Sequence, residues 1–319
     1  MEALSAKRNR IGSRRLDSVL LLDKRAGISS NAALQEAKRL FRAAKAGHSG
    51  TLDPLASGLL PVLFGEATKF SRFLLDSDKA YLARVQLGVT TTTGDAEGEV
   101  TQRRRVAVVD GAIEAALARF RGESMQVPPM YSALKRNGRP LYKLARQGAV
   151  VAREPRRVVI RTLEYHGRTG DVLELRVLCS KGTYLRTLAE DLGTVLGTGA
   201  HLAALRRTAA GPFTVEQAVS LESLVTMDEE SRDKALIPID GLLESLPLVR
   251  LDAAGARSFS NGRPVPHPPA EQGRCRVYGD AGVLLGIGEV NAAGELRPVR
   301  LLAGLPGVAQ AAEIPGKNL

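Results

Sequence analysis

Tryptophan is absent from this 319-residue sequence, and cysteine and histidine are scarce. The two cysteines, Cys179 and Cys275, lie far apart and form no C-x-x-C pair, so neither a disulfide framework nor a cysteine zinc site is predicted. We interpret both as buried thiols. None of the histidines has metal-ligand spacing, so no catalytic metal is predicted; they are His48, His166, His201 and His267.

Long hydrophobic runs are missing too. Near the N-terminus the only apolar run is VLLL at 19–22, which Asp23 ends. This run is far too short for a signal-peptide core or a membrane span. The G-x-G-x-x-G and Walker patterns that bind nucleotide phosphates are also absent. We therefore expect a cytoplasmic protein that has no membrane contact and uses no small-molecule cofactor.

Positive charge is what the sequence has in excess. It contains 45 Lys and Arg against 34 Asp and Glu, which gives a formal net charge of +11 and an isoelectric point near 9.9. The 44% hydrophobic content is ordinary for a folded globular protein. The charge favours a polyanionic partner such as nucleic acid. Residues 1–17 carry five of the basic residues, and they are interpreted as a flexible basic arm that meets phosphates or as a solvated tail.

Hydrophobic periodicity predicts mixed helices and strands up to about residue 235. The segment 81–87 alternates, so Tyr81 is expected on an apolar strand face. The polar, glycine-rich segment 88–98 is expected to be a loop. Predicted helices cover 32–43, 66–75, 111–120, 185–195 and 221–235, and further predicted strands cover 18–23, 158–163 and 172–178.

The pattern changes from residue 247 onward. One short helix at 253–259 is followed by β-like segments at 274–278, 283–290 and 295–302. We therefore predict a main domain at 18–246, a small mainly β domain at 247–305, and a frayed tail at 306–319.

The segment 47–70 places one carboxylate, Asp53, in an irregular stretch with apolar sequence behind it. Pro54 disfavours helical geometry at Asp53, so the side chain is expected on a loop. The apolar residues after it predict a short helix that turns at Pro61 into a buried strand. The alternative is that Asp53 only caps a helix begun by Pro54.

Two motifs carry a family resemblance. GHSGTLDPLASGLL at 47–60 matches every fixed position of G-H-x-G-x-L-D-P-x-A-x-G-x-L, and it resembles the catalytic motif of the pseudouridine synthases, closest to the TruB family. LDKRAGISSN at 22–31 resembles the family's first motif, L-D-K-P-x-G-x-x-S, with Arg25 in place of the proline. The resemblance runs from about residue 20 to 302.

The resemblance implies a set of active-site residues. Asp53 corresponds to the catalytic aspartate and Tyr81 to the active-site tyrosine. CSKGTYLRTL at 179–188 resembles the segment that supplies an aromatic, Tyr184, and an arginine, Arg186. LAALRR at 202–207 resembles the segment whose leucine, Leu205, packs beneath the base. Without the resemblance, the tyrosines and Leu205 could be core residues and Arg186 a surface cation.

Further residues are expected to contact RNA. His48 is a candidate wedge for the space that a flipped base leaves. Lys24 and Lys69 are candidate contacts, and Asp95 matches the aspartate of the family's RNA-contacting loop. The segment 126–144 mixes tyrosines with cations, which is typical both of RNA contacts and of ordinary loops.

The resemblance also implies a fold and a reaction. The fold is α+β, with a mixed or antiparallel sheet in the catalytic domain and a PUA-like RNA-binding domain at the C-terminus. The family isomerises a uridine in the T-loop of tRNA, uridine-55, by base flipping and an aspartate-dependent rearrangement of the glycosidic bond, without cofactor or metal. We expect a monomer that binds the T-arm. The alternatives are a guide-RNA-dependent synthase of the dyskerin type, and a non-catalytic RNA-binding protein or tRNA folding chaperone.

Overall fold

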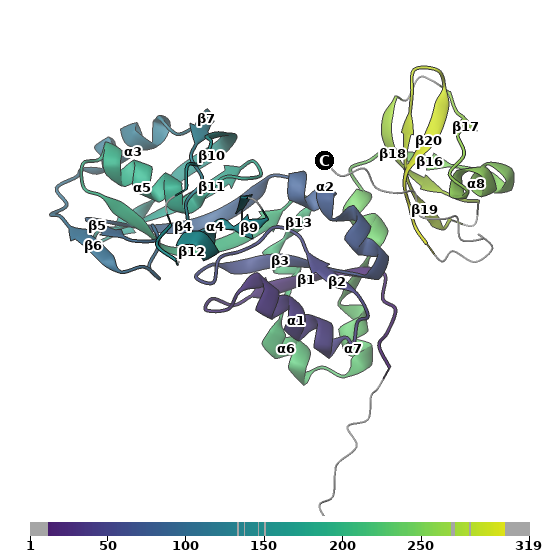
Figure 1. Ribbon diagram of the computed structural model, residues 1–319, viewed down its shortest axis with the longest axis horizontal. Helices are drawn as coiled ribbons and strands as arrows, with labels where there is room; N and C mark the ends of the chain where they lie inside the picture. The colour runs from purple at the N-terminus through teal and green to yellow at the C-terminus, as the bar shows by residue number, and fades with distance from the viewer. Residues whose placement is uncertain are drawn as a thin grey trace, which may run out of the picture.

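A mixed β-sheet runs through the middle of the main domain (Figure 1). The computed structural model describes residues 12–303, except 133, 137, 146, 150, 269–271 and 281. Within them the strand order is β14-β1-β3-β12-β4-β11-β10-β7. These strands are β14 (Val219–Ser220), β1 (Ser18–Lys24), β3 (Ser57–Phe64), β12 (Ala200–Ala210), β4 (Lys79–Leu87), β11 (Val172–Cys179), β10 (Arg156–Thr169) and β7 (Gly122–Gln126). The predicted α+β class with a mixed sheet is confirmed.

The pairing of β3 with β12 joins the two halves of this sheet. It is parallel, with Arg207 opposite Gly58, whereas β12 runs antiparallel to β4 on its other side. Shorter strands extend the sheet at its margins. These are β2 (Ala46–His48) on β3, β13 (Phe213–Thr214) on β12 and β15 (Leu236–Pro238) on β1.

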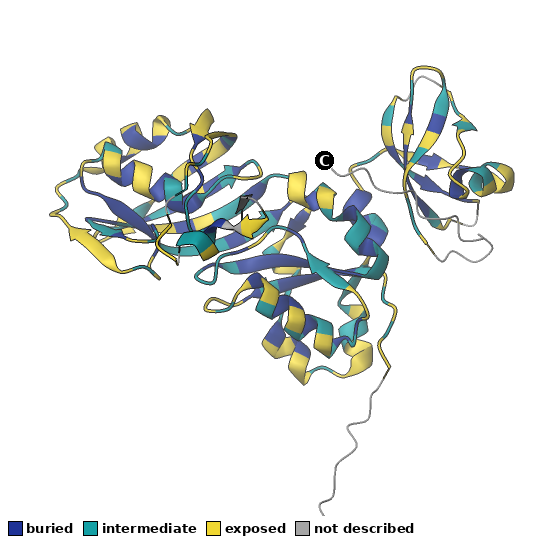
Figure 2. Cartoon of the chain, in the orientation of Figure 1, coloured by how far each residue is buried: buried dark blue, intermediate teal, exposed yellow. Residues whose placement is uncertain are grey.

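Two groups of helices cover one face of the sheet. On the β4 side α3 (Asp110–Ala118) and α5 (Leu185–Val195) complete one core cluster, and on the β1 side α1 (Ser30–Leu40) and α6 (Leu221–Thr226) complete a second. Their apolar stripes recur at helical spacing and are buried, as Figure 2 shows. Tyr81 and Leu205 pack against both clusters. The two core clusters therefore adjoin at Tyr81 and Leu205.

The opposite face of the β1 and β3 half carries a third core cluster. Val19 and Leu21 of β1 pack there with η1 (Gly65–Phe70), α2 (Ser71–Asp76) and η3 (Ile239–Leu243). Ile287, from the C-terminal part of the chain, belongs to this same cluster and is 1% exposed. The C-terminal part is therefore packed onto the main domain through a buried side chain.

The C-terminal part forms a separate lobe with its own sheet (Figure 1). The strand order is β16-β18-β19-β20-β17, and α8 (Ala253–Ser260) packs against it through the buried Phe259. The predicted small, mainly β unit is thus confirmed. Its strands are β16 (Leu248–Arg250), β17 (Val265–Pro266), β18 (Gly273–Tyr278), β19 (Leu284–Val290) and β20 (Glu295–Leu301).

Three predicted helices differ from the structure. No helix follows Pro54; the chain turns there and enters β3 directly, because the 57–64 segment pairs along its length with β1. Sheet pairing outweighs the local helical pattern. The segment 66–75 divides into the 3₁₀-helix η1 and α2. The segment 221–235 divides into α6 and α7 (Glu229–Lys234), because Asp228 caps α7 by accepting a hydrogen bond from the Ser231 amide.

The remaining elements are short and lie in the connections. They are β5 (Val89–Thr91), β6 (Val100–Arg103), β8 (Lys135–Arg136), β9 (Arg139–Pro140), α4 (Leu141–Ala145) and the 3₁₀-helix η2 (Val215–Gln217). Among the described residues, no helix has the length and apolarity needed to cross a lipid bilayer.

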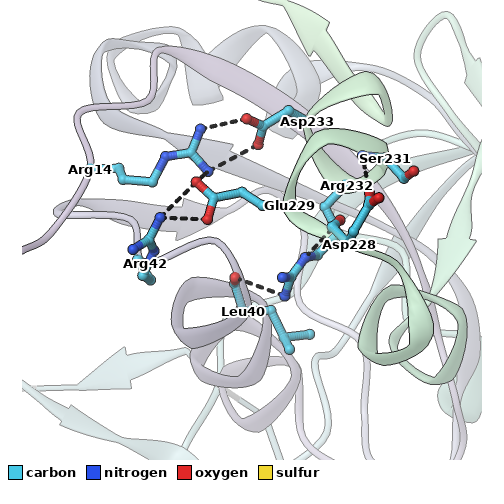
Figure 3. A network of polar contacts seen from close by, with 8 residues as sticks. All are labelled: Arg14, Leu40, Arg42, Asp228, Glu229, Ser231, Arg232 and Asp233. Atoms are coloured by element: carbon cyan, nitrogen blue, oxygen red, sulfur yellow. Dashed lines mark hydrogen bonds and ion pairs between the residues drawn. The ribbon is translucent and has the colours of Figure 1, made fainter. Parts of the chain in front are cut away.

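The two chain ends lie mostly outside the described residues. Of the predicted basic arm, residues 12–17 are described, and Arg14 forms ion pairs with Glu229 and Asp233 of α7 (Figure 3). Arg42 shares Glu229 in the same network. The predicted tail at 306–319 lies outside the described residues.

Candidate active site

A pocket of about 330 Å³ opens where the two core clusters adjoin, at Tyr81 and Leu205. Five of the residues predicted from the sequence line it, although up to 152 positions separate them along the chain. They come from the loop before β3, from β4, from the start of α5 and from β12, and they are Asp53, Tyr81, Tyr184, Arg186 and Leu205. The fold therefore brings the separated motifs into one site.

Hydrogen bonds to its backbone fix the loop that carries Asp53. The buried Ser30 hydroxyl accepts a hydrogen bond from the Leu52 amide (2.8 Å) and donates one to the Leu52 carbonyl (2.9 Å). The Gly27 amide donates to the Pro54 carbonyl at 2.8 Å. Asp53 thus lies in a turn held from both sides. Because no helix starts at Pro54, the interpretation of Asp53 as a helix cap is wrong.

Arg186 holds the Asp53 carboxylate. Its Nη2 lies 2.9 Å from Asp53 Oδ2, and its Nε lies 3.5 Å from Asp95 Oδ2. The Arg186 side chain is 4% exposed and that of Asp53 is 40% exposed. The guanidinium also donates to the carbonyl oxygens of Thr93 and Tyr131. The planar fork of Arg186 is therefore fixed, and the carboxylate it orients is the one that faces the pocket.

Opposing effects act on the Asp53 carboxyl. Burial raises its pKa, and the nearby charge of Asp95 adds to this rise. The charges of Arg186 and Lys24 and the hydrogen bond from Arg186 act in the opposite direction. Arg186 therefore favours the ionised carboxylate in a setting that otherwise favours the protonated form.

The two tyrosines stay protonated at neutral pH. Burial raises the pKa of Tyr81 and that of Tyr184 above their ordinary values. Tyr184 immediately precedes α5, where Gln126 fixes its backbone: the Tyr184 amide donates to Gln126 Oε1 (2.8 Å), and Gln126 Nε2 donates to the Tyr184 carbonyl (3.1 Å). Leu205 lies on β12, just after an irregularity in its pairing with β4. Together they give the pocket a largely apolar wall.

Comparison of the sequence with family models shows which family the chain belongs to. Residues 38–185 match the model for the TruB family pseudouridylate synthase N-terminal domain. Residues 186–244 match that for the tRNA pseudouridylate synthase B C-terminal domain, and residues 247–302 that for the pseudouridine synthase II TruB C-terminus. The chain belongs to the TruB family. This identity agrees with the motif resemblance in the sequence.

Curated relatives cover nearly the whole TruB-family chain. A protein of Dechloromonas aromatica (strain RCB) is 54% identical over 91% of this chain and 96% of its own length. One of Burkholderia mallei (strain ATCC 23344) is 55% identical over 92% and 97%, and one of Stutzerimonas stutzeri (strain A1501) is 55% identical over 91% and 96%. All three are called tRNA pseudouridine synthase B.

A solved structure shares the fold. The chain is 28% identical to a chain in the crystal structure of a Cbf5-Nop10-Gar1 complex, with a TM-score of 0.68 over 86% of this chain and 78% of that one. The similarity extends through most of both chains. It supports the same arrangement of catalytic and C-terminal parts.

Two predicted RNA contacts are interior residues in this TruB-family chain. Lys24 is 0% exposed, and its ammonium donates to the carbonyl oxygens of Arg25 (2.9 Å), Ile28 (2.7 Å) and Pro54 (3.4 Å). Burial lowers its pKa to about 8. Asp95 is 3% exposed and pairs with Arg186. Through these contacts Lys24 supports the Asp53 loop and Asp95 supports Arg186, and their predicted RNA contacts stay predictions.

Lys69 is also engaged within the protein. Its Nζ lies 2.5 Å from Glu66 Oε2 and donates to the Leu301 carbonyl at 3.2 Å. The same Glu66 oxygen accepts a hydrogen bond from the Ala303 amide at 2.7 Å. Lys69 therefore links the main domain to the end of β20, and its predicted RNA contact is left as a prediction.

His48 lies at the end of β2, outside the set of pocket-lining residues. Its Nδ1 is buried and has no hydrogen-bond partner among the described residues. Burial lowers its pKa, and the charge of Arg207 lowers it further. The ring is therefore neutral at physiological pH, which suits stacking better than phosphate binding.

Two buried cations of the pocket were not predicted from the sequence. Arg207 is 1% exposed and Lys79 is 7% exposed, and both line the pocket. Burial lowers the pKa of Lys79 to about 8. One sequence signal could have indicated that Arg207 faces the pocket. It lies two residues after Leu205, and residues two apart lie on the same face of a strand.

Proposed function

We propose that this chain isomerises uridine-55 in the T-loop of tRNA to pseudouridine. The observation that carries this proposal is the Asp53 carboxylate held at 2.9 Å by the buried Arg186 inside a pocket walled by Tyr81, Tyr184 and Leu205. Relatives at 54–55% identity, named for this activity on tRNA, support the substrate class.

The reaction breaks the N-glycosidic bond, turns the uracil, and rejoins it to the same ribose through carbon. Atoms are neither added nor lost, so no co-reactant is required. The target base has to leave its stack to reach the pocket, at a cost of roughly a few kcal/mol. Contacts to the flipped base and to the vacated loop offset this cost.

Each pocket residue then has one role. Asp53 acts in its ionised form on the ribose or the base, and Arg186 keeps that carboxylate ionised and aimed. Tyr81 and Leu205 support the two faces of the uracil, and Tyr184 completes the apolar wall. The neutral ring of His48 fills the space that the base leaves.

The remaining expectations concern the rest of the tRNA and the enzyme as a whole. We propose a monomer, cytoplasmic in location, whose catalytic domain at 18–246 binds the T-arm and whose PUA-like domain at 247–305 adds backbone contacts. Support for the division comes from the separate core cluster of the C-terminal part. Because Lys24 is buried, Arg15 of the basic arm and the exposed cations Arg263, Arg297 and Arg300 of the C-terminal part are better candidates for phosphate contacts.

The test is an isomerisation assay on an unmodified tRNA transcript, without guide RNA or other protein. Pseudouridine is mapped by carbodiimide modification and primer extension, and a transcript with cytidine at position 55 is the matched control. We expect one pseudouridine per tRNA, at position 55 only. A requirement for guide RNA would favour the dyskerin-type alternative, and tight binding without isomerisation would favour the chaperone alternative; either result contradicts the proposal.

A further inference from the structure

Arg207 is a fully buried cation of the pocket. It is 1% exposed, lines the pocket, and forms no ion pair among the described residues. A buried guanidinium is costly unless hydrogen bonds replace its lost hydration. Its place in the lining of the pocket suggests a role that a neutral apolar residue could not fill.

The hydrogen bonds of Arg207 tie the Asp53 loop to the sheet. Nη2 donates to the Gly50 carbonyl at 2.9 Å, three residues before Asp53. Nε donates to the Leu59 carbonyl of β3 at 2.6 Å. On β12, the Arg207 backbone lies opposite Tyr81 of β4 and opposite Gly58 of β3. One residue therefore joins the loop, the strand after the loop, and the strand that carries Tyr81.

Two glycines of the Asp53 motif fit around Arg207. Gly50 has φ +75°, and a Cβ there would lie 3.1 Å from Arg207 Nη1. Gly58 has φ +98°, and a Cβ there would lie 2.2 Å from the Arg207 carbonyl oxygen. The left-handed backbone alone favours glycine at both positions, and the close approach of Arg207 reinforces that requirement. The loop and the arginine are thus complementary in shape as well as in hydrogen bonding.

We propose that Arg207 is a positioning residue of this active site, which fixes the Asp53 loop relative to Tyr81 by its two carbonyl contacts. The inference rests on the proposed function, since it assigns Arg207 a part in that same reaction. Arg207 acts on Asp53 indirectly, through Gly50 and through the β3–β12–β4 junction. Its charge also reaches the site, because it lowers the pKa of His48 and opposes the rise in the pKa of Tyr81.

The test compares Arg207→Lys with Arg206→Lys in the full-length protein. Lysine keeps the charge but lacks the planar fork that reaches two carbonyl oxygens. For Arg207→Lys we expect the single-turnover rate at saturating tRNA to fall roughly 10- to 100-fold, because small misplacements of reacting groups cost that much. We expect the dissociation constant for tRNA to stay near the parental value. Arg206 is a matched neighbour that pairs with Asp23, and its variant should keep both parental values.

A parental rate for Arg207→Lys at saturating tRNA would overturn the proposal, whether or not tRNA binding weakens. The parental enzyme, measured in the same assay, separates this failure from failure of the proposed function. If the parent isomerises tRNA and Arg207→Lys is equally fast, only the role of Arg207 is wrong.

A second variant keeps the test decisive if Arg207→Lys does not fold. Gly50→Ala retains the arginine but places a methyl group close to its Nη1. We expect the same pattern, a slower rate at unchanged affinity, and a parental rate would contradict the proposal. Where both variants fold, their combined loss should be smaller than the product of the single losses, because both act on one contact. A fully multiplicative loss would separate Gly50 from Arg207 and overturn the inference.

Discussion

Two cations that line the pocket, Arg207 and Lys79, have different partners from Arg14 and Arg42 of the surface network in Figure 3. Arg207 and Lys79 are almost fully buried and donate to backbone carbonyl oxygens. Arg14 and Arg42 pair with carboxylates of α7, where the Glu229 side chain is 51% exposed. Both groups contribute equally to the net charge of the chain.

The location of a cation in the fold, rather than its charge, therefore decides whether it shapes the pocket. Carbonyl oxygens are fixed by the sheet and the loop, so a buried cation between them holds a single geometry. An exposed carboxylate moves with its own side chain, and water and salt screen the pair. We therefore expect substitutions around the pocket to change the reaction, and substitutions in the surface network to leave it unchanged.

The largest effect among the cations is expected for Arg186→Lys. Lysine preserves the charge but cannot hold Asp53 while also donating to two carbonyl oxygens. We expect the single-turnover rate to fall roughly 100-fold or more, with little change in tRNA affinity. Parallel filter-binding and isomerisation assays measure the two quantities. Near-parental turnover would show that Arg186 is only a structural cation.

The pH dependence of the reaction tests the electrostatics of Asp53. Because burial raises its pKa, the carboxylate takes up a proton at higher pH than an ordinary aspartate as the pH falls. The single-turnover rate should then fall about tenfold per pH unit below that pKa, provided that tRNA stays bound.

Asp95→Asn supplies the comparison for this profile. It removes a negative charge that raises the pKa of Asp53. The acidic limb should therefore move to lower pH, whatever the effect on the maximum rate. A limb that stays at the same pH in this variant would mean that another group limits the rate.

A matched pair of serines separates loop positioning from stability. Ser30→Ala leaves the Leu52 amide unpaired inside the protein, which costs about 1–3 kcal/mol and loosens the Asp53 loop. Ser29→Ala removes the cap of α1, where Ser29 accepts from the Ala32 amide, and costs roughly 1 kcal/mol. Both should lower the melting temperature. Only Ser30→Ala should slow the isomerisation, and an equal slowing in both would attribute it to stability alone.

The smallest effect is expected for Arg14→Ala in the surface network. Its ion pairs with Glu229 and Asp233 involve partly exposed side chains, so their loss should cost no more than about 1 kcal/mol. Denaturant unfolding measures this cost, and it should shrink further at high salt. Turnover at saturating tRNA should stay parental. A slower reaction would mean that this network also shapes the pocket.

Local pattern predicted most of the elements but only part of their boundaries. The strand at β1, the helix at α1 and the mainly β C-terminal unit follow from periodicity and are confirmed. The short helix expected after Pro54 is wrong, because pairing of β3 with β1 is a long-range contact that leaves no local signal. The splitting of the 221–235 helix at Asp228 was missed, although Asp is a common helix cap.

For the site, too, the motifs predicted which residues take part but not how deeply they are buried. Asp53, Tyr81 and Arg186 were found by motif, and their pocket follows from the fold. Lys24 and Asp95 were predicted to contact RNA from their places in segments that resemble the family's motifs. Pro54, one of the partners of Lys24, and Arg186, the partner of Asp95, are far away in sequence, so the motifs did not indicate burial. Arg207 was missed because the carbonyl oxygens that accept its hydrogen bonds belong to residues that are far away in the sequence.

The most direct test of the account is single-turnover isomerisation by Asp53→Asn, measured on the same preparation as tRNA affinity and melting temperature. Asparagine keeps the size of the side chain but removes the negative charge and the nucleophilic oxygen. Because the folded-state pKa of Asp53 is raised, the ionised carboxylate costs stability at neutral pH, so its removal should not lower the melting temperature. We predict no detectable pseudouridine, with tRNA binding retained. Isomerisation at the parental rate would contradict the central claim that the Asp53 carboxylate, held by Arg186, carries out the reaction.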